Sequence, residues 1–284
     1  AALRLHREDG TRAAERRGNK DLGARLAAAL EAEPERYMTA RLDTSLPVDG
    51  EALRKVVIQR RQALAFRATE PCPPKPIPAL LPGSIWAVTA LFNPVGYGSK
   101  QRNFEHFRAG LREVGLPLLA IELAFGDAPF QLAEDSADNV LRLRGGDVLW
   151  QKERLLNVAI GALPAACDKV VWLDADVLFE DGAWVAKTAK LLERFVVVQP
   201  FSRSARLLAG ETSIAIGELP IGSGEHEVLH GMAYGVAQKG LGSLHRYLVH
   251  GHSGYAWAAR RSVLQKHGLY DANVLGNGDL NIAH

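Results

Sequence analysis

Residues 170–180, VVWLDADVLFE, carry the strongest indication of fold and function in the sequence. Four apolar residues lead into Asp174 and Asp176, and apolar residues then resume. Side chains two positions apart share a face of an extended segment, so we expect both carboxylates on one face beyond a buried strand. Two such oxygen donors can hold Mn²⁺ or Mg²⁺ against a diphosphate. Alternatively, the two carboxylates could cap the following helix or form ion pairs with nearby lysine and arginine side chains.

The sequence on both sides of this stretch alternates between short apolar strands and helices. The pattern predicts strands at 84–92, 116–123, 139–144, 169–173 and 195–200, and helices at 100–115, 150–164 and 182–195. Such alternation predicts an α/β fold with a mostly parallel sheet covered by helices on both faces. Ligands of these sheets bind at the carboxyl ends of the strands, where the two acids stand.

A proline-rich segment divides the chain. Residues 71–82, PCPPKPIPALLP, hold six of the 14 prolines, and proline fixes φ and removes a backbone donor. We therefore expect an extended linker over 71–83. Residues 1–70 show helical periodicity and are expected to form a helical, partly disordered N-terminal segment, while residues 84–284 form the α/β domain.

Composition narrows the classes of partner. A net charge of +2 gives no argument for nucleic acid or an anionic membrane as partner. No apolar run approaches the roughly 20 residues of a membrane span, so no transmembrane segment is expected. The two cysteines lie far apart, which favours a reducing compartment and a cytoplasmic location. The chain begins without methionine and ends at NIAH, as a fragment truncated at its C-terminus would.

Several motifs occur in the order found in nucleotide-sugar glycosyltransferases of the GT-A fold. They are LFNPVGYGSKQRN after the first strand, WQKERLLN before the acid-bearing strand, VVWLDADVLF itself, and HSGYAWAARRSVLQKHGLYDANVLGNGD near the end. Residues 84–284 resemble that family through this order and spacing. The resemblance implies a GT-A-like sheet and a nucleotide-sugar donor.

The resemblance also assigns roles by position. Asp174 and Asp176 would hold the divalent ion and the donor, and His284 would be an additional metal ligand. The residues implied to contact the donor nucleotide or sugar are Asn93, Tyr97, Glu122, Lys152, Asn157, His252 and Gly254. Asp279 takes the position of the acid that faces the acceptor.

The implied reaction transfers a sugar from the nucleotide donor to a hydroxyl of a glycan, a lipid-linked molecule or a protein. A positioned carboxylate can remove the proton of an attacking hydroxyl, so Asp279 is predicted as the general base of an inverting enzyme. Asp279 could instead be the N-cap of a short helix over LNIAH.

Three other functions fit parts of the sequence. HEVLH, residues 226–230, satisfies the H-E-x-x-H pattern of zinc metalloproteases, with Glu227 as base, although the glycines around it disfavour a helix. The residues DADVL fit a haloacid-dehalogenase-type phosphatase, in which Asp174 is the nucleophile and Asp176 the general acid. A non-catalytic nucleotide-sugar-binding module is the third alternative.

Overall fold

The computed structural model describes residues 2–4, 73–222, 224–240, 251–272 and 278–279. These residues belong to one compact unit formed by Ala1–His6 and Ala68–His284. The helical segment expected over residues 1–70 lies outside the described residues apart from its first few positions.

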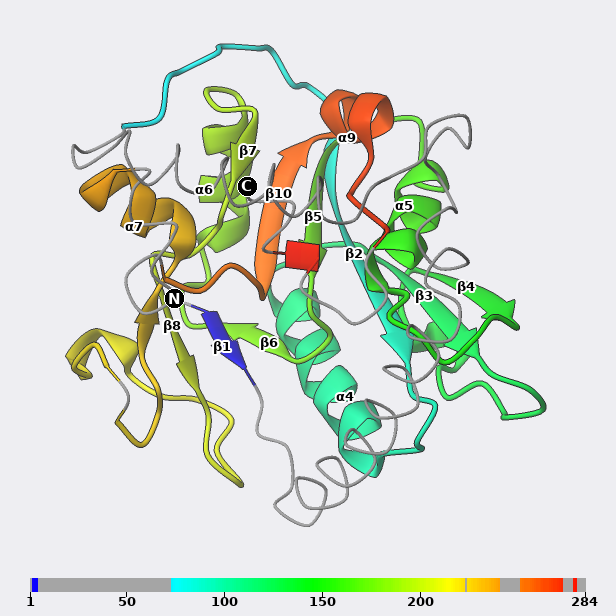
Figure 1. The fold of residues 1–284 in the computed structure, drawn as a ribbon. Coiled ribbons are helices and arrows are strands. Elements are labelled where there is room, and N and C mark those ends of the chain that lie inside the picture. The colour runs from blue at the N-terminus through cyan, green and yellow to red at the C-terminus, as the bar shows by residue number, and fades with distance from the viewer. Residues whose placement is uncertain (1, 5–72, 223, 241–250, 273–277, 280–284) are drawn as a thin grey trace, which may run out of the picture. The chain divides into compact units, whose positions relative to one another are not determined.

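A six-stranded sheet forms the centre of this unit, in the order β4-β3-β2-β5-β10-β7 (Figure 1). Its strands are β2 (Ser84–Phe92), β3 (Leu118–Ala124), β4 (Asn139–Arg144), β5 (Cys167–Leu173), β7 (Val197–Val198) and β10 (Ala256–Arg260). The first four in that order are parallel, whereas β10 is antiparallel to both of its neighbours. The predicted α/β fold with a mostly parallel sheet is confirmed.

Helices cover both faces of this sheet. They are α4 (Gly98–Glu113), α5 (Lys152–Gly161), α6 (Trp184–Leu192) and α9 (Arg261–His267), whereas α7 (Met232–Lys239) follows β9 (Leu229–His230) of the smaller sheet described below. Phe107 of α4 and Trp184 of α6 join one hydrophobic cluster, while Leu156 of α5 and Leu264 of α9 join another. Adjacent residues of β2 alternate between the two clusters, as the period of a strand requires. Within the described ranges, no helix has the length and apolar content that a membrane crossing needs.

A second, four-stranded sheet was not predicted. Its order is β6-β1-β8-β9, and its strands are β1 (Ala2–Arg4), β6 (Val177–Phe179), β8 (Arg203–Arg206) and β9 (Leu229–His230). β1 pairs antiparallel with β6 and parallel with β8. β6 begins one turn after Asp174, so the acid-bearing stretch connects the two sheets.

The described part of the proline-rich segment, residues 73–83, contains no helix or strand. Two backbone amides fix it to the end of α6, because Ile77 N donates to Arg194 O at 2.7 Å and Ala79 N to Glu193 O at 2.9 Å. The Arg260 guanidinium of β10 also donates to the Ile77 carbonyl. The segment is therefore attached to the α/β unit along this stretch.

Candidate active site

Three charged residues from distant parts of the chain meet at the carboxyl end of β5. Lys152, the first residue of α5, places its Nζ 2.6 Å from Asp174 Oδ1. The same Nζ lies 3.1 and 3.0 Å from the two carboxylate oxygens of Asp279. We call Lys152, Asp174 and Asp279 the acid–lysine cluster. All three were predicted site residues, and the structure brings them together.

The charge on Lys152 is maintained by its two partners. Burial of the ammonium would lower its pKa, but the carboxylates of Asp174 and Asp279 outweigh burial and raise the pKa above its usual range. The side chain of Lys152 is 11% exposed, and those of Asp174 and Asp279 are 16% and 21% exposed. Poorly hydrated charges interact more strongly than surface charges, so this ion-paired arrangement is well fixed.

Neighbouring strands hold the backbone of Asp174. Its amide donates to the carbonyl of Tyr255 at 2.8 Å, just before β10, and the Thr89 hydroxyl of β2 donates to the Leu173 carbonyl at 2.8 Å. The register of β10 on β5 places Ala256 opposite Leu173. Asp174 therefore leaves the sheet at a point fixed from both sides.

The segment from His252 to Tyr255 lies beside Asp279. A Cβ on Gly254 would stand 3.0 Å from Asp279 Oδ2 and 3.2 Å from the His252 ring, so glycine gives room for both. The His252 ring stacks on Tyr255 at 3.7 Å, and its Nδ1 accepts the Gly254 amide at 3.1 Å. Tyr255 has φ of 76°, a left-handed conformation that is uncommon outside glycine. His252 and Gly254 thus lie next to the cluster.

Glu153 was not predicted as a site residue, yet its side chain adjoins the cluster. It is 2% exposed, and the Trp150 indole donates to its Oε2 at 2.8 Å. Its Oε1 has no hydrogen-bond partner within the described part of the chain. Burial raises the pKa of Glu153, since the charged form is poorly hydrated there. A Cβ on Gly278 would stand 2.0 Å from Oε1, so only glycine fits against this carboxylate.

The predicted nucleotide-facing residues have defined structural partners. Asn93 closes the turn after β2, because its Oδ1 accepts the Tyr97 amide at 3.0 Å and its Nδ2 donates to the Tyr97 carbonyl at 3.0 Å. The Glu122 carboxylate accepts the amides of Gln131 at 2.5 Å and Leu132 at 3.0 Å. These bonds order the loops after β2 and β3. Nucleotide contacts by Asn93, Tyr97 and Glu122 stay predictions.

Asn157 lies one and a half turns along α5 from Lys152 and binds a different segment. Its Oδ1 accepts the Leu269 amide at 2.7 Å, and its Nδ2 donates to the Leu269 carbonyl at 2.9 Å. It therefore fixes the chain after α9. A donor contact by Asn157 stays a prediction.

The predicted metal ligands do not form a closed site made only of protein side chains. They fit better a metal ion that binds together with the substrate. Asp174 and Asp176 are partly exposed at the mouth of β5, and His284 lies outside the described residues. Among the described residues, no group of three or more His, Cys, Asp or Glu side chains could hold a metal ion. Mg²⁺ is commonly bound by one or two carboxylates together with substrate phosphates and water.

The HEVLH segment is not helical. Glu227 has φ of 44°, and Leu229 and His230 form β9. His226 Nδ1 approaches Glu211 Oε2 at 3.5 Å, and Glu227 pairs with Arg206 at 3.1 Å. The helical face on which two histidines would bind zinc is therefore missing, which removes the structural basis of the metalloprotease alternative.

Comparison with known proteins gives little further information. No family model matches the chain, and no curated protein matches it. Among solved structures, a 4-diphosphocytidyl-2C-methyl-D-erythritol synthase from Anaerococcus prevotii is similar, with a TM-score of 0.37 and 12% identity over 65% of this chain and 73% of that chain. Nothing about function follows from a similarity of this strength.

Proposed function

We propose that the α/β unit is a glycosyltransferase that moves a sugar from a nucleotide-sugar donor to a hydroxyl acceptor. The observation that supports this proposal is the acid–lysine cluster at the carboxyl end of β5. Its members occupy three positions that the motif resemblance assigns to donor binding and acceptor activation. Ligand sites of parallel α/β sheets lie at this end of the strands.

Asp279 acts as the general base in this proposal. As the acceptor oxygen bonds to the anomeric carbon, its proton passes to the Asp279 carboxylate and the nucleoside diphosphate leaves from the opposite face. The configuration at that carbon is therefore inverted. Lys152 orients Asp279 through both carboxylate oxygens, and proton transfer to a positioned group typically contributes about 10²–10⁴-fold to rate.

Asp174 and Asp176 would hold a divalent ion on the donor side of the site. Mn²⁺ or Mg²⁺ held there would neutralise charge on the leaving group. Asp174 presents one oxygen to Lys152, so Lys152 sets the orientation of the donor-side carboxylate as well as that of Asp279. The acceptor is a hydroxyl on a glycan, lipid-linked molecule or protein.

The test combines binding with stereochemistry. Thermal unfolding is followed with a panel of nucleoside diphosphates and nucleotide sugars, each with and without Mn²⁺. A ligand at 100 times its Kd adds about 2.7 kcal/mol of stability. The stabilising nucleotide sugar is then incubated with acceptors, and the anomeric configuration of the product is read by NMR.

Asp279→Asn should lower turnover by about 10²–10⁴-fold while leaving donor affinity nearly unchanged. Glu134→Gln, whose side chain is 94% exposed, serves as the control carboxylate. Retention of anomeric configuration would contradict the inverting mechanism. Absence of any nucleotide binding, with phosphate release that depends on Asp174, would favour the phosphatase instead.

A further inference from the structure

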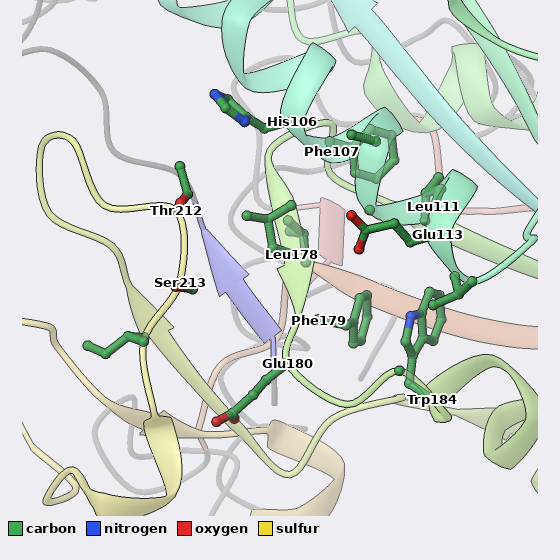
Figure 2. A pocket seen from close by; sticks show the side chains of 16 residues that line it. His106, Phe107, Leu111, Glu113, Leu178, Phe179, Glu180, Trp184, Thr212 and Ser213 are labelled. Atoms are coloured by element: carbon green, nitrogen blue, oxygen red, sulfur yellow. The ribbon is translucent and has the colours of Figure 1, made fainter.

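A cavity of about 420 Å³ lies between α4, β6 and the loop over residues 212–214, and no member of the acid–lysine cluster lines it (Figure 2). Its floor is apolar and includes Phe107 and Leu111 of α4 and Leu178 of β6. Phe107 and Leu111 belong to the core under the large sheet, whereas Leu178 packs against the core of the small sheet. The cavity therefore lies at the seam between the two sheets, and its volume is that of a small-molecule site.

An aromatic pair gives one wall a fixed shape. The rings of Phe179 and Trp184 stack at 3.8 Å with an angle of 9° between their planes. Trp184 is 4% exposed, so its packing in the core limits movement of the Phe179 ring. A wall of this kind is formed before a ligand binds, which lowers the entropy that binding must overcome.

The polar side chains that line the cavity are exposed to solvent. They are His106, Glu113, Glu180, Thr212 and Ser213. None of their side chains forms a hydrogen bond or ion pair with another described residue. No lysine or arginine belongs to the described residues that line the cavity. In the view of Figure 2, Phe179 lies between the carboxylates of Glu113 and Glu180.

We propose that this cavity binds a small organic cation, namely a protonated amine on an apolar body. The apolar body would contact the floor, and the ammonium would lie near Phe179 within reach of the carboxylates. Ammonium groups are attracted both to carboxylates and to aromatic faces. Among the described lining residues, no lysine or arginine would offset the two carboxylates against an anion, so we expect phosphates and carboxylates to bind more weakly than the amine.

The test compares three probes of similar shape and different charge by isothermal titration calorimetry at pH 7. Phenethylamine is cationic, 2-phenylethanol is neutral and 3-phenylpropionate is anionic. We expect the amine to bind at least tenfold more tightly than the alcohol, and the acid to show no binding. Glu113→Gln/Glu180→Gln should abolish the preference for the amine, with the fold checked by circular dichroism. Phe179→Leu should weaken binding of both the amine and the alcohol.

Glu105→Gln is the matched control, since Glu105 is exposed on the same helix and does not line the cavity. It should leave the affinity for phenethylamine within twofold. Equal affinity for amine and acid would overturn the proposal, and so would a preference for the amine that persists in Glu113→Gln/Glu180→Gln. No step of this test involves nucleotide or metal, so its outcome is independent of the glycosyltransferase proposal.

Discussion

Replacement of Gly278 by alanine tests whether close packing against Glu153 positions Asp279. The new Cβ would lie 2.0 Å from Glu153 Oε1, 2.2 Å from Cδ and 2.8 Å from Cγ. All three distances are shorter than any ordinary contact, so one of the two segments must move. Glu153 has little freedom to move, because it is 2% exposed and its Oε2 accepts the Trp150 indole. We therefore expect Gly278 to move and Asp279 to move with it.

The size of the effect follows from packing and from catalytic geometry. Overpacking of a close-packed site costs about 1–3 kcal/mol in the free energy of unfolding. Displacement of Asp279 also lengthens its bonds to Lys152, now 3.0 and 3.1 Å. A shift of about 1 Å in a positioned group can lower turnover by about 100-fold. Gly278→Ala should therefore show both losses.

Urea unfolding measures the loss of stability, and rates of the proposed sugar transfer measure the loss of turnover. Gly161→Ala is the control, because Gly161 belongs to the same helix as Glu153 and a Cβ there meets nothing within 4 Å. The control should be at least as stable as the wild type, since alanine favours helix by about 1 kcal/mol. Glu153→Ala makes room for the new methyl, so Glu153→Ala/Gly278→Ala should be more stable than the two single changes predict. Wild-type stability of Gly278→Ala, or strict additivity in the double variant, would refute the packing argument.

Other predictions concern the same region and the HEVLH segment. Lys152→Met leaves two partly buried carboxylates without their shared cation and should lower the free energy of unfolding by about 3 kcal/mol in denaturant titrations; an unchanged midpoint would show that the ion pairs contribute nothing. Because the pKa of Glu153 is raised in the folded state, the folded protein holds the Glu153 proton more tightly than the unfolded chain does. The resulting stabilisation is complete below the ordinary glutamate pKa and is lost as pH rises through the raised pKa of the folded state. Glu153→Gln should flatten that part of the stability–pH curve, and an identical slope in both proteins would exclude Glu153 as its source. His226→Ala and Glu227→Ala should keep the proposed transfer activity within about tenfold of wild type. Stoichiometric zinc that is lost in these variants would restore the metalloprotease alternative.

The sequence predicted the large sheet well where its strands carry strong local signals. The range 84–92 agrees with β2 because Gly83 and the Asn93-Pro94 turn mark both of its ends. β10 had no such signal, since its sequence AWAAR lacks β-branched residues. It is a strand because it pairs with β5, for example through Trp257 opposite Trp172. Pairing over that separation is a tertiary effect that local patterns do not contain.

Prediction of the site had a similar limit. Asp174, Lys152 and Asp279 were each singled out, but nothing local indicates that residues 152 and 279 share an ion pair. Glu153 has the pattern of an exposed acid in the first turn of a helix, which is where acids commonly lie. Its burial depends on Trp150 and Gly278. Gly278 allows the close approach to Glu153, but a glycine in the sequence does not identify the residue that approaches it.

The position of β10 between β5 and β7 has a consequence for synthesis on the ribosome. β5 ends at residue 173, whereas β10 begins at residue 256. At about 5–20 residues per second, the edge of β5 that receives β10 waits roughly 4–17 seconds for its partner. An exposed strand edge is a template for pairing with other chains. Nascent chains that stop before residue 256 should therefore need chaperones to remain soluble. Of the described strands of the large sheet, β10 is synthesised last, and it is the strand that joins β7 to β5.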